Sequence, residues 1–108
     1  MITYEQFKDL ELRTAKVLRV EEHPNADRLY VLTVDLGDEQ RTIVAGIKQH
    51  YTAEELEGKT IVVLANLQPT TLRGVESAGM LLAASTPERD KVVVLTTDKD
   101  LPAGCRIS

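Results

Sequence analysis

Cationic side chains cluster near the start of the chain, where Arg13, Lys16 and Arg19 follow one another without an acidic residue between them. Arg41 and Lys48 add two more positive charges further along. Guanidinium and ammonium groups form strong, charge-assisted hydrogen bonds to phosphate oxygens. The cluster therefore suggests a local anion-binding patch, with a solvated face of ordinary mixed charge as the alternative.

The charge of the whole chain opposes a general attraction to nucleic acid. Thirteen Lys and Arg stand against seventeen Asp and Glu, which gives a formal net charge of −4. A protein-wide basic field is thereby excluded, and any phosphate contact must come from a local patch on an acidic body.

No residue pattern in the chain supports catalysis or metal binding. His23 and Asp27 lack a third ligand at suitable spacing, so a turn-stabilising role is expected for them. The single cysteine, Cys105, excludes an internal disulfide and a cysteine zinc knuckle. Because there is no phosphate-cradling glycine loop and no Ser/His/Asp or Cys/His arrangement, we predict a protein that is not an enzyme and has no metal or cofactor.

The length of 108 residues is enough for one core, so we predict a single domain spanning residues 1–108. The longest apolar stretches, Ile61 to Ala65 and Met80 to Ala84, have five residues, against about 20 for a bilayer crossing. With no leader pattern at the start, we expect a soluble, cytoplasmic protein without membrane association.

The elements that would position these groups are mostly strands. Short β-branched or alternating runs separated by turn signals predict a small barrel or sandwich. The runs expected to form strands are 12–20, 30–36, 41–46, 60–65, 80–84 and 91–96. Alternation slips phase between Leu12 and Val17, which predicts a bulge in the first strand. One short helix is expected after Thr52, which forms a capping box with Glu55, and Gly58 would end it.

This order matches an all-β, five-stranded Greek-key OB-fold barrel with one short helix between strands three and four and a C-terminal β extension. Such barrels bind oligonucleotides on the face of strands two and three and through the loops that join strands one to two and four to five. Here those loops are residues 23–28 and 66–77. This functional hint is an analogy from the fold.

Several motifs in the expected order carry a more specific signal. They are His23-Pro24-Asn25-Ala26-Asp27-Arg28-Leu29-Tyr30, the stretch from Leu72 through Gly74-Val75-Glu76-Ser77 and Gly79-Met80 to Leu82, and the shorter segments 12–17, 44–46 and 51–58. With them the chain closely resembles the tRNA-binding domain family over about residues 2–107. That family includes the C-terminal domain of bacterial and archaeal methionyl-tRNA synthetases and free-standing, structure-specific tRNA-binding proteins of this length.

The resemblance implies an OB-fold homodimer that recognises tRNA by shape, with Asn66, Arg73, Ser77 and Met80 lining the RNA surface. Arg73 would offer a planar fork of donors to phosphate, and Asn66 and Ser77 would bond 2′-hydroxyls. Met80 would give a soft apolar contact. The alternatives are core packing for Met80, loop backbone bonds for Asn66 and Ser77, and pairing with Glu76 for Arg73.

The chain departs from the family where charge matters. Residues 68–72 are uncharged where relatives usually carry a basic run, and Thr33 replaces a lysine. Each lost phosphate contact reduces the slope of log K against log salt concentration by close to one. We therefore predict weaker, less salt-sensitive tRNA binding than in a typical relative, or a shifted patch made of Arg13, Lys16, Arg28 and Arg41.

The function predicted is a non-catalytic tRNA-binding module, either a free-standing homodimer or the C-terminal domain of a methionyl-tRNA synthetase. A start at Met1 favours the free-standing form, and Leu101 and Ile107 are candidate interface residues. Two alternatives stay open: a polypeptide-binding chaperone of the CsaA type, and a purely structural dimerisation domain.

Overall fold

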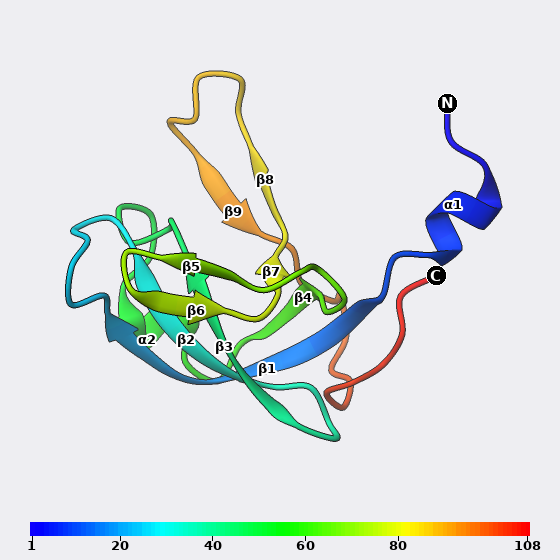
Figure 1. Ribbon diagram of the computed structural model, residues 1–108, viewed down its shortest axis with the longest axis horizontal. Coiled ribbons are helices and arrows are strands. Elements are labelled where there is room, and N and C mark those ends of the chain that lie inside the picture. Colours follow the sequence, from blue (N-terminus) through cyan, green and yellow to red (C-terminus); the bar gives the residue numbers. More distant parts are fainter.

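The computed structural model describes all 108 residues, and one five-stranded sheet forms its centre. The strands lie in the order β3-β2-β1-β4-β7 (Figure 1). Their bounds are β1 Leu12–Glu22, β2 Tyr30–Asp35, β3 Gln40–Ala45, β4 Thr60–Leu64 and β7 Met80–Leu81. The two edges approach each other, since Ala78 of the segment between β6 and β7 donates its N–H to the Thr42 carbonyl of β3 at 2.9 Å. The sheet is thereby a nearly closed barrel.

The barrel interior is filled by the alternating side chains of its strands. Along β2, Tyr30, Leu32 and Val34 are buried while the residues between them are partly exposed. This alternation places every second residue on the core face, as the sequence predicts. The all-β, five-stranded barrel is confirmed, whereas the Greek-key connectivity and the single-domain organisation stay predictions.

The bulge in β1 lies further along the strand than expected. The register against β2 shifts between Val17 and Arg19, so that Leu18 is the extra residue. The predicted position between Leu12 and Val17 is therefore wrong. Val17 and Val20 are both buried although they are three residues apart, and an inserted residue is what lets a strand turn both toward the core.

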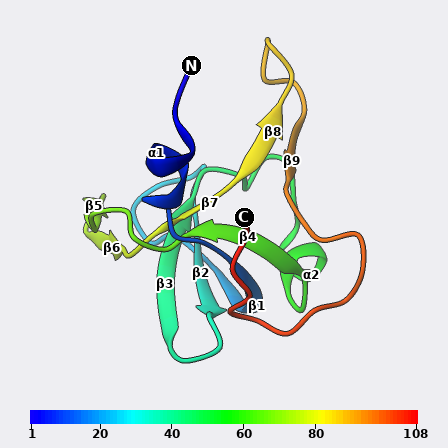
Figure 2. The same ribbon diagram turned by 90° about the vertical axis from the view of Figure 1, so that its right-hand side faces the viewer.

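Two hairpins and two short helices complete the chain (Figure 2). The helices are α1 Tyr4–Lys8 and α2 Ala53–Leu56. The hairpins pair β5 Thr70–Leu72 with β6 Val75–Ser77, and β8 Ala83–Ser85 with β9 Val92–Val94. The protein contains no helix with the length and apolarity that a membrane span requires.

The predicted helix after Thr52 is confirmed. The Thr52 hydroxyl accepts from the Glu55 N–H at 3.2 Å, and the Glu55 carboxylate accepts from the Thr52 N–H at 2.7 Å. Gly58 follows with φ +85°, and Leu56 is fully buried. The reciprocal cap and one buried leucine thus hold a helix of four residues.

Three expectations about elements are corrected. The segment 66–77, expected as a loop, contains the β5–β6 hairpin, and the strand expected over 80–84 breaks at Leu82 into β7 and β8. Helix α1 was not expected, although Thr3 and Gln6 form a capping box there. All three elements contain few buried side chains, so hydrophobic periodicity carries little signal for them.

Candidate nucleic-acid interface

The two loops expected to bind RNA lie side by side and are bonded to each other. His23, at the start of the loop between β1 and β2, places Nε2 2.8 Å from the Leu72 carbonyl at the end of β5. The Asn25 side-chain amide donates to the Arg73 carbonyl at 3.3 Å. Two segments about 50 residues apart in sequence therefore form one surface at the left end of the molecule in Figure 1.

The His23 ring holds the loop between β1 and β2 in shape. Its Nδ1 accepts from the Asn25 N–H at 2.9 Å. A nitrogen that accepts carries no proton, so in the neutral ring the hydrogen lies on Nε2 and is donated to the Leu72 carbonyl. The residue is 6% exposed. The expected turn-stabilising role of His23 is confirmed, and the contact with β5 adds a second role that the sequence did not indicate.

Arg73 stands at the tip of the β5–β6 hairpin. It has φ +53° and Gly74 has φ +92°, the pair of positive values that a tight two-residue hairpin turn adopts. Its side chain is exposed, and its guanidinium forms none of the ion pairs of the protein, so the alternative of pairing with Glu76 does not hold. A left-handed backbone costs an arginine about 1 kcal/mol, and such strain concentrates at functional sites.

Ser77 is buried, which corrects its expected role as an RNA-facing donor. It is 3% exposed, its hydroxyl oxygen accepts from the Val44 N–H at 2.9 Å, and the hydroxyl donates to the Gly79 carbonyl at 3.0 Å. The hydroxyl hydrogen is therefore already donated within the protein, and no donor is left for a 2′-hydroxyl. Ser77 instead fastens the base of the β5–β6 hairpin to β3.

Asn66 is exposed, but its amide is bonded to the segment that precedes β1. Its oxygen accepts from the Glu11 N–H at 2.9 Å, and its nitrogen donates to the Asp9 carbonyl at 2.7 Å. Of the two roles considered for Asn66, the structure favours hydrogen bonding to backbone groups. The bonded backbone belongs to residues 9–11, which are distant in sequence, and not to the loop that contains Asn66.

Met80 lies on the surface. It pairs with Leu64 at the start of β7 and is 44% exposed. It lines a groove of about 360 Å³ with mostly apolar walls between the end of β3 and the β8–β9 hairpin. The alternative of ordinary core packing does not fit this position.

The shifted patch proposed from the sequence is largely neutralised by carboxylates. Arg13 is 14% exposed and contacts Asp38 at 3.1 Å, Glu11 at 3.5 Å and the Leu36 carbonyl at 2.8 Å. Lys16 lies 3.9 Å from Asp100. The hydrogen bond from Arg13 holds the pKa of Asp38 below its ordinary value. These two cations connect β1 to neighbouring turns of the protein.

Arg41 is tied to the barrel in the same way. It is 23% exposed, its Nε donates to Glu39 at 2.7 Å, and its terminal nitrogen donates to the carbonyls of Ala65 and Ala78. The bond with Glu39 raises the pKa of Arg41 and lowers that of Glu39. Of the four cations of the shifted patch, only Arg28, in the loop beside the hairpin tip, is exposed and forms no ion pair.

The family model "Putative tRNA binding domain" matches residues 12–106. The chain belongs to this tRNA-binding domain family. The resemblance inferred from the motifs is thereby confirmed.

The similar proteins include both synthetases and chaperones. A methionine–tRNA ligase of Thermococcus kodakarensis is 54% identical over 98% of this chain, and the chain spans 14% of that protein's length. The crystal structure of a MetRS-related protein from Pyrococcus horikoshii superimposes with a TM-score of 0.94 at 35% identity, covering 100% of this chain and 98% of the other. The crystal structure of the chaperone CsaA from Bacillus anthracis superimposes with a TM-score of 0.89 at 33% identity, covering 100% of this chain and 99% of the other.

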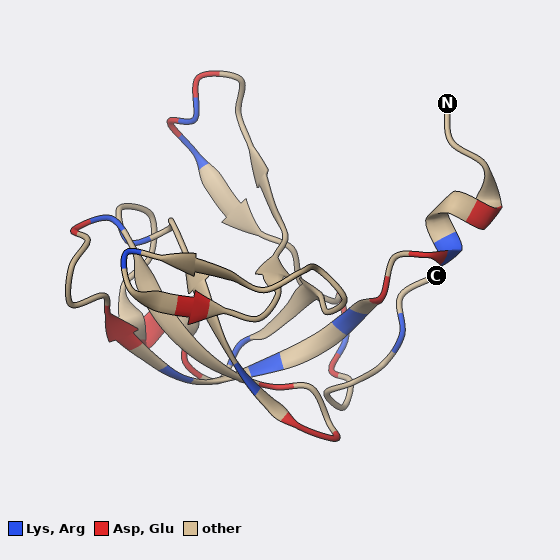
Figure 3. Ribbon diagram, viewed as in Figure 1, with Lys and Arg blue, Asp and Glu red and all other residues tan.

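Two cations without ion pairs lie on the surface that the loop before β2 and the β5–β6 hairpin form. Figure 3 shows basic segments in the loop before β2 and at the tip of β5–β6, at the same end of the molecule. These are the segments of Arg28 and Arg73. No three His, Cys, Asp or Glu side chains lie close enough together to hold a metal ion.

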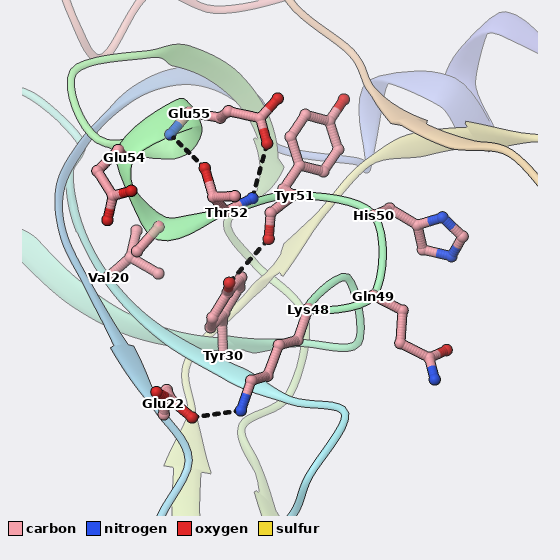
Figure 4. A pocket seen from close by; sticks show the side chains of 11 residues that line it. Val20, Glu22, Tyr30, Lys48, Gln49, His50, Tyr51, Thr52, Glu54 and Glu55 are labelled. Atoms are coloured by element: carbon pink, nitrogen blue, oxygen red, sulfur yellow. Dashed lines mark hydrogen bonds and ion pairs between the residues drawn. The ribbon is translucent and has the colours of Figure 1, made fainter.

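A polar hollow of about 610 Å³ beside α2 is a weaker candidate for a site. Several of its polar groups bond one another, as Figure 4 shows: the Tyr30 hydroxyl donates to the Tyr51 carbonyl at 2.7 Å, and Lys48 pairs with Glu22. The bond with Glu22 raises the pKa of Lys48 and lowers that of Glu22. Lys48 is therefore engaged within the protein.

Proposed function

We propose that this domain is a non-catalytic module that binds tRNA by its shape. The binding surface consists of the loop at 23–29 and the β5–β6 hairpin. The observation that carries this proposal is Arg73, an exposed and unpaired cation on a tip that a neighbouring loop holds by two hydrogen bonds. A fixed edge that offers phosphate donors suits folded RNA, which proteins recognise mostly by shape and by backbone contacts.

The small number of free cations on this surface predicts a modest dependence of tRNA affinity on salt concentration. Each neutralised phosphate contributes about 0.7 to 0.9 to the slope of log K against log salt concentration. With Arg28 and Arg73 as the contacts, the expected slope is about −1.4 to −1.8. A slope of this size agrees with the prediction of weak, less salt-sensitive tRNA binding. We do not include the shifted patch in the proposed surface, because Arg13, Lys16 and Arg41 pair with carboxylates.

The test is a titration of total tRNA and of a duplex DNA of equal charge at two salt concentrations. It compares the wild type with Arg73→Ala and with Arg89→Ala. Arg89 is a matched control because it is also exposed and has φ +59°, in the turn of the β8–β9 hairpin. We expect Arg73→Ala to weaken tRNA binding about tenfold, since a charged hydrogen bond is worth about 1.5 kcal/mol, and Arg89→Ala to leave it within twofold.

Two results would contradict the proposal. Equal affinity for tRNA and duplex DNA that is abolished by salt would indicate generic electrostatics only. Equal losses in the two arginine variants would show that the β5–β6 tip has no special part in binding.

We further propose that the module works as a homodimer or attached to a methionyl-tRNA synthetase, in the cytoplasm. Linking binding modules raises effective affinity without new contacts, which would offset the small number of free cations on the proposed binding surface. Candidates for the self-association contacts are the exposed apolar side chains of Val93, Leu95 and Leu101. Light scattering of the purified chain at several concentrations tests self-association, and a monomer at all concentrations would exclude the dimer.

A polypeptide-binding role of the CsaA type is the second candidate. The apolar groove beside Met80 favours it, since exposed apolar concavities suit extended peptides. Binding of unfolded peptides without binding of tRNA would establish this function in place of the first. Binding of neither would leave a structural dimerisation domain.

A further inference from the structure

His23 bridges two segments through opposite sides of one buried ring. Nδ1 accepts from the Asn25 N–H in its own loop at 2.9 Å, and Nε2 lies 2.8 Å from the Leu72 carbonyl, 49 residues further along. Leu72 immediately precedes Arg73. The ring therefore contacts the backbone one residue away from the arginine that the proposed function relies on.

We propose that His23 is a positioning residue for tRNA binding, because its Nε2–H bond to the Leu72 carbonyl fixes the tip of the β5–β6 hairpin and with it the direction of Arg73. This inference rests on the proposed function, in which Arg73 contacts tRNA. It assigns His23 no contact with RNA, because the ring is buried.

The hairpin needs such a bond because its own structure is weak. Its strands have three residues each, and residues 70–74 are all exposed. An isolated two-stranded hairpin is marginally stable in water. At its base Ser77 bonds β3, whereas at its tip the bonds to other segments come from His23 and Asn25. Without the tip bonds, ordering of Arg73 would have to occur on binding, which lowers affinity.

Two substitutions separate the two hydrogen bonds of the ring. In His23→Asn the side-chain oxygen can still accept from the N–H two residues on, as asparagine does in turns, but the side chain is too short for Leu72. In His23→Gln the longer amide can still donate to the Leu72 carbonyl, while the bond to the Asn25 N–H is lost. The proposal predicts that RNA affinity follows the bond to Leu72.

The experiment measures tRNA affinity and urea unfolding for His23→Asn, His23→Gln, Arg73→Ala and the double variant His23→Asn/Arg73→Ala in the full chain. We expect His23→Asn to bind about fivefold more weakly and His23→Gln to bind within twofold of wild type. The double variant should bind no more weakly than Arg73→Ala alone, because the histidine acts through the arginine. A merely structural histidine would give additive losses.

A spectroscopic measurement checks the geometry directly. Nitrogen-15 chemical shifts of the His23 ring should show the proton on Nε2 in the free protein. A neutral ring with its proton on Nδ1 would overturn the proposal, because Nε2 would then have no hydrogen to donate to the Leu72 carbonyl.

The outcomes distinguish this inference from the proposed function. If Arg73→Ala loses affinity while His23→Asn folds and binds like wild type, the positioning role is wrong and the proposed function stands. If Arg73→Ala binds like wild type, the proposed function itself loses its main contact. Should both His23 variants fail to fold, the nitrogen-15 measurement on the wild-type ring decides: a neutral ring without a proton on Nε2 overturns the proposal.

Discussion

Two short hairpins leave the barrel of this protein, and each consists of a pair of three-residue strands. Each also carries an exposed arginine with a positive φ in its turn, Arg73 in β5–β6 and Arg89 in β8–β9. They differ in what holds the turn. The β5–β6 tip is bonded to the loop before β2, whereas the β8–β9 turn is closed by its own residues, with Thr86 bonded to Asp90 and Lys91.

The attachment to the barrel differs as well. The β8–β9 hairpin is anchored by the buried side chains of Val92 and Val94, and its turn stands away from the barrel in Figure 1. The β5–β6 hairpin has a hydroxyl anchor, Ser77, and lies beside β3. A turn arginine can serve recognition when a second segment holds its backbone, and this distinguishes Arg73 from Arg89.

The largest expected effect concerns the anchor of β5–β6. Ser77→Ala leaves the Val44 N–H without its acceptor in a buried position, which costs about 1 to 3 kcal/mol of unfolding free energy. Ser85→Ala in β8 is the matched control, because that serine is exposed and should change stability by less than about 0.5 kcal/mol. Urea unfolding of both variants measures the difference, and equal midpoints would remove the distinction between the two anchors.

A smaller effect separates stability from binding at the two turns. Asparagine adopts the left-handed conformation more readily than arginine does, so Arg73→Asn and Arg89→Asn should each raise stability by about 0.5 kcal/mol. Only Arg73→Asn should weaken tRNA binding. Thermal unfolding and a tRNA titration on the same samples test this, and weaker binding by Arg89→Asn would show that both turns meet the RNA.

The smallest effect is an acid dependence confined to the β8–β9 turn. The hydrogen bond from the Thr86 hydroxyl lowers the pKa of Asp90 from its ordinary value of 3.8. A carboxyl whose folded pKa is lowered stabilises the fold above its unfolded pKa, and this stabilisation is lost as the pH falls through the folded pKa. Between pH 5 and pH 2, wild type should therefore lose slightly more thermal stability than Asp90→Asn. An equal loss in both proteins would mean that this bond does not contribute to stability.

Much of the barrel could be predicted from local patterns. Tyr30, Leu32 and Val34 alternate with partly exposed residues, and this period of two indicates a half-buried strand whatever surrounds it. Thr52 and Glu55 lie three residues apart and complete each other's cap without any distant partner. The β5–β6 hairpin was not predicted, because its strands are short and β5 is exposed along its whole length. Such strands have no alternation of apolar and polar residues that could identify them in the sequence.

The candidate site was predicted only in part, for a related reason. Arg73 and Met80 are exposed as the motifs imply, but Ser77 faces Val44, 33 residues away, and Asn66 faces the segment before β1. Whether a polar side chain in a loop points to solvent depends on which backbone groups the fold brings to it. No spacing within the loop contains that information.

By itself, the sequence determined the barrel strands, the capped helix and the family, because alternation, caps and motifs are local and act over a few residues. Only the tertiary structure decided which cations are free, because the pairing of Arg13 with Asp38 joins β1 to the turn after β2 across 25 residues. It also decided that His23 holds the tip that carries Arg73. Both follow from contacts between segments distant in sequence, whose geometry exists only after the chain has folded.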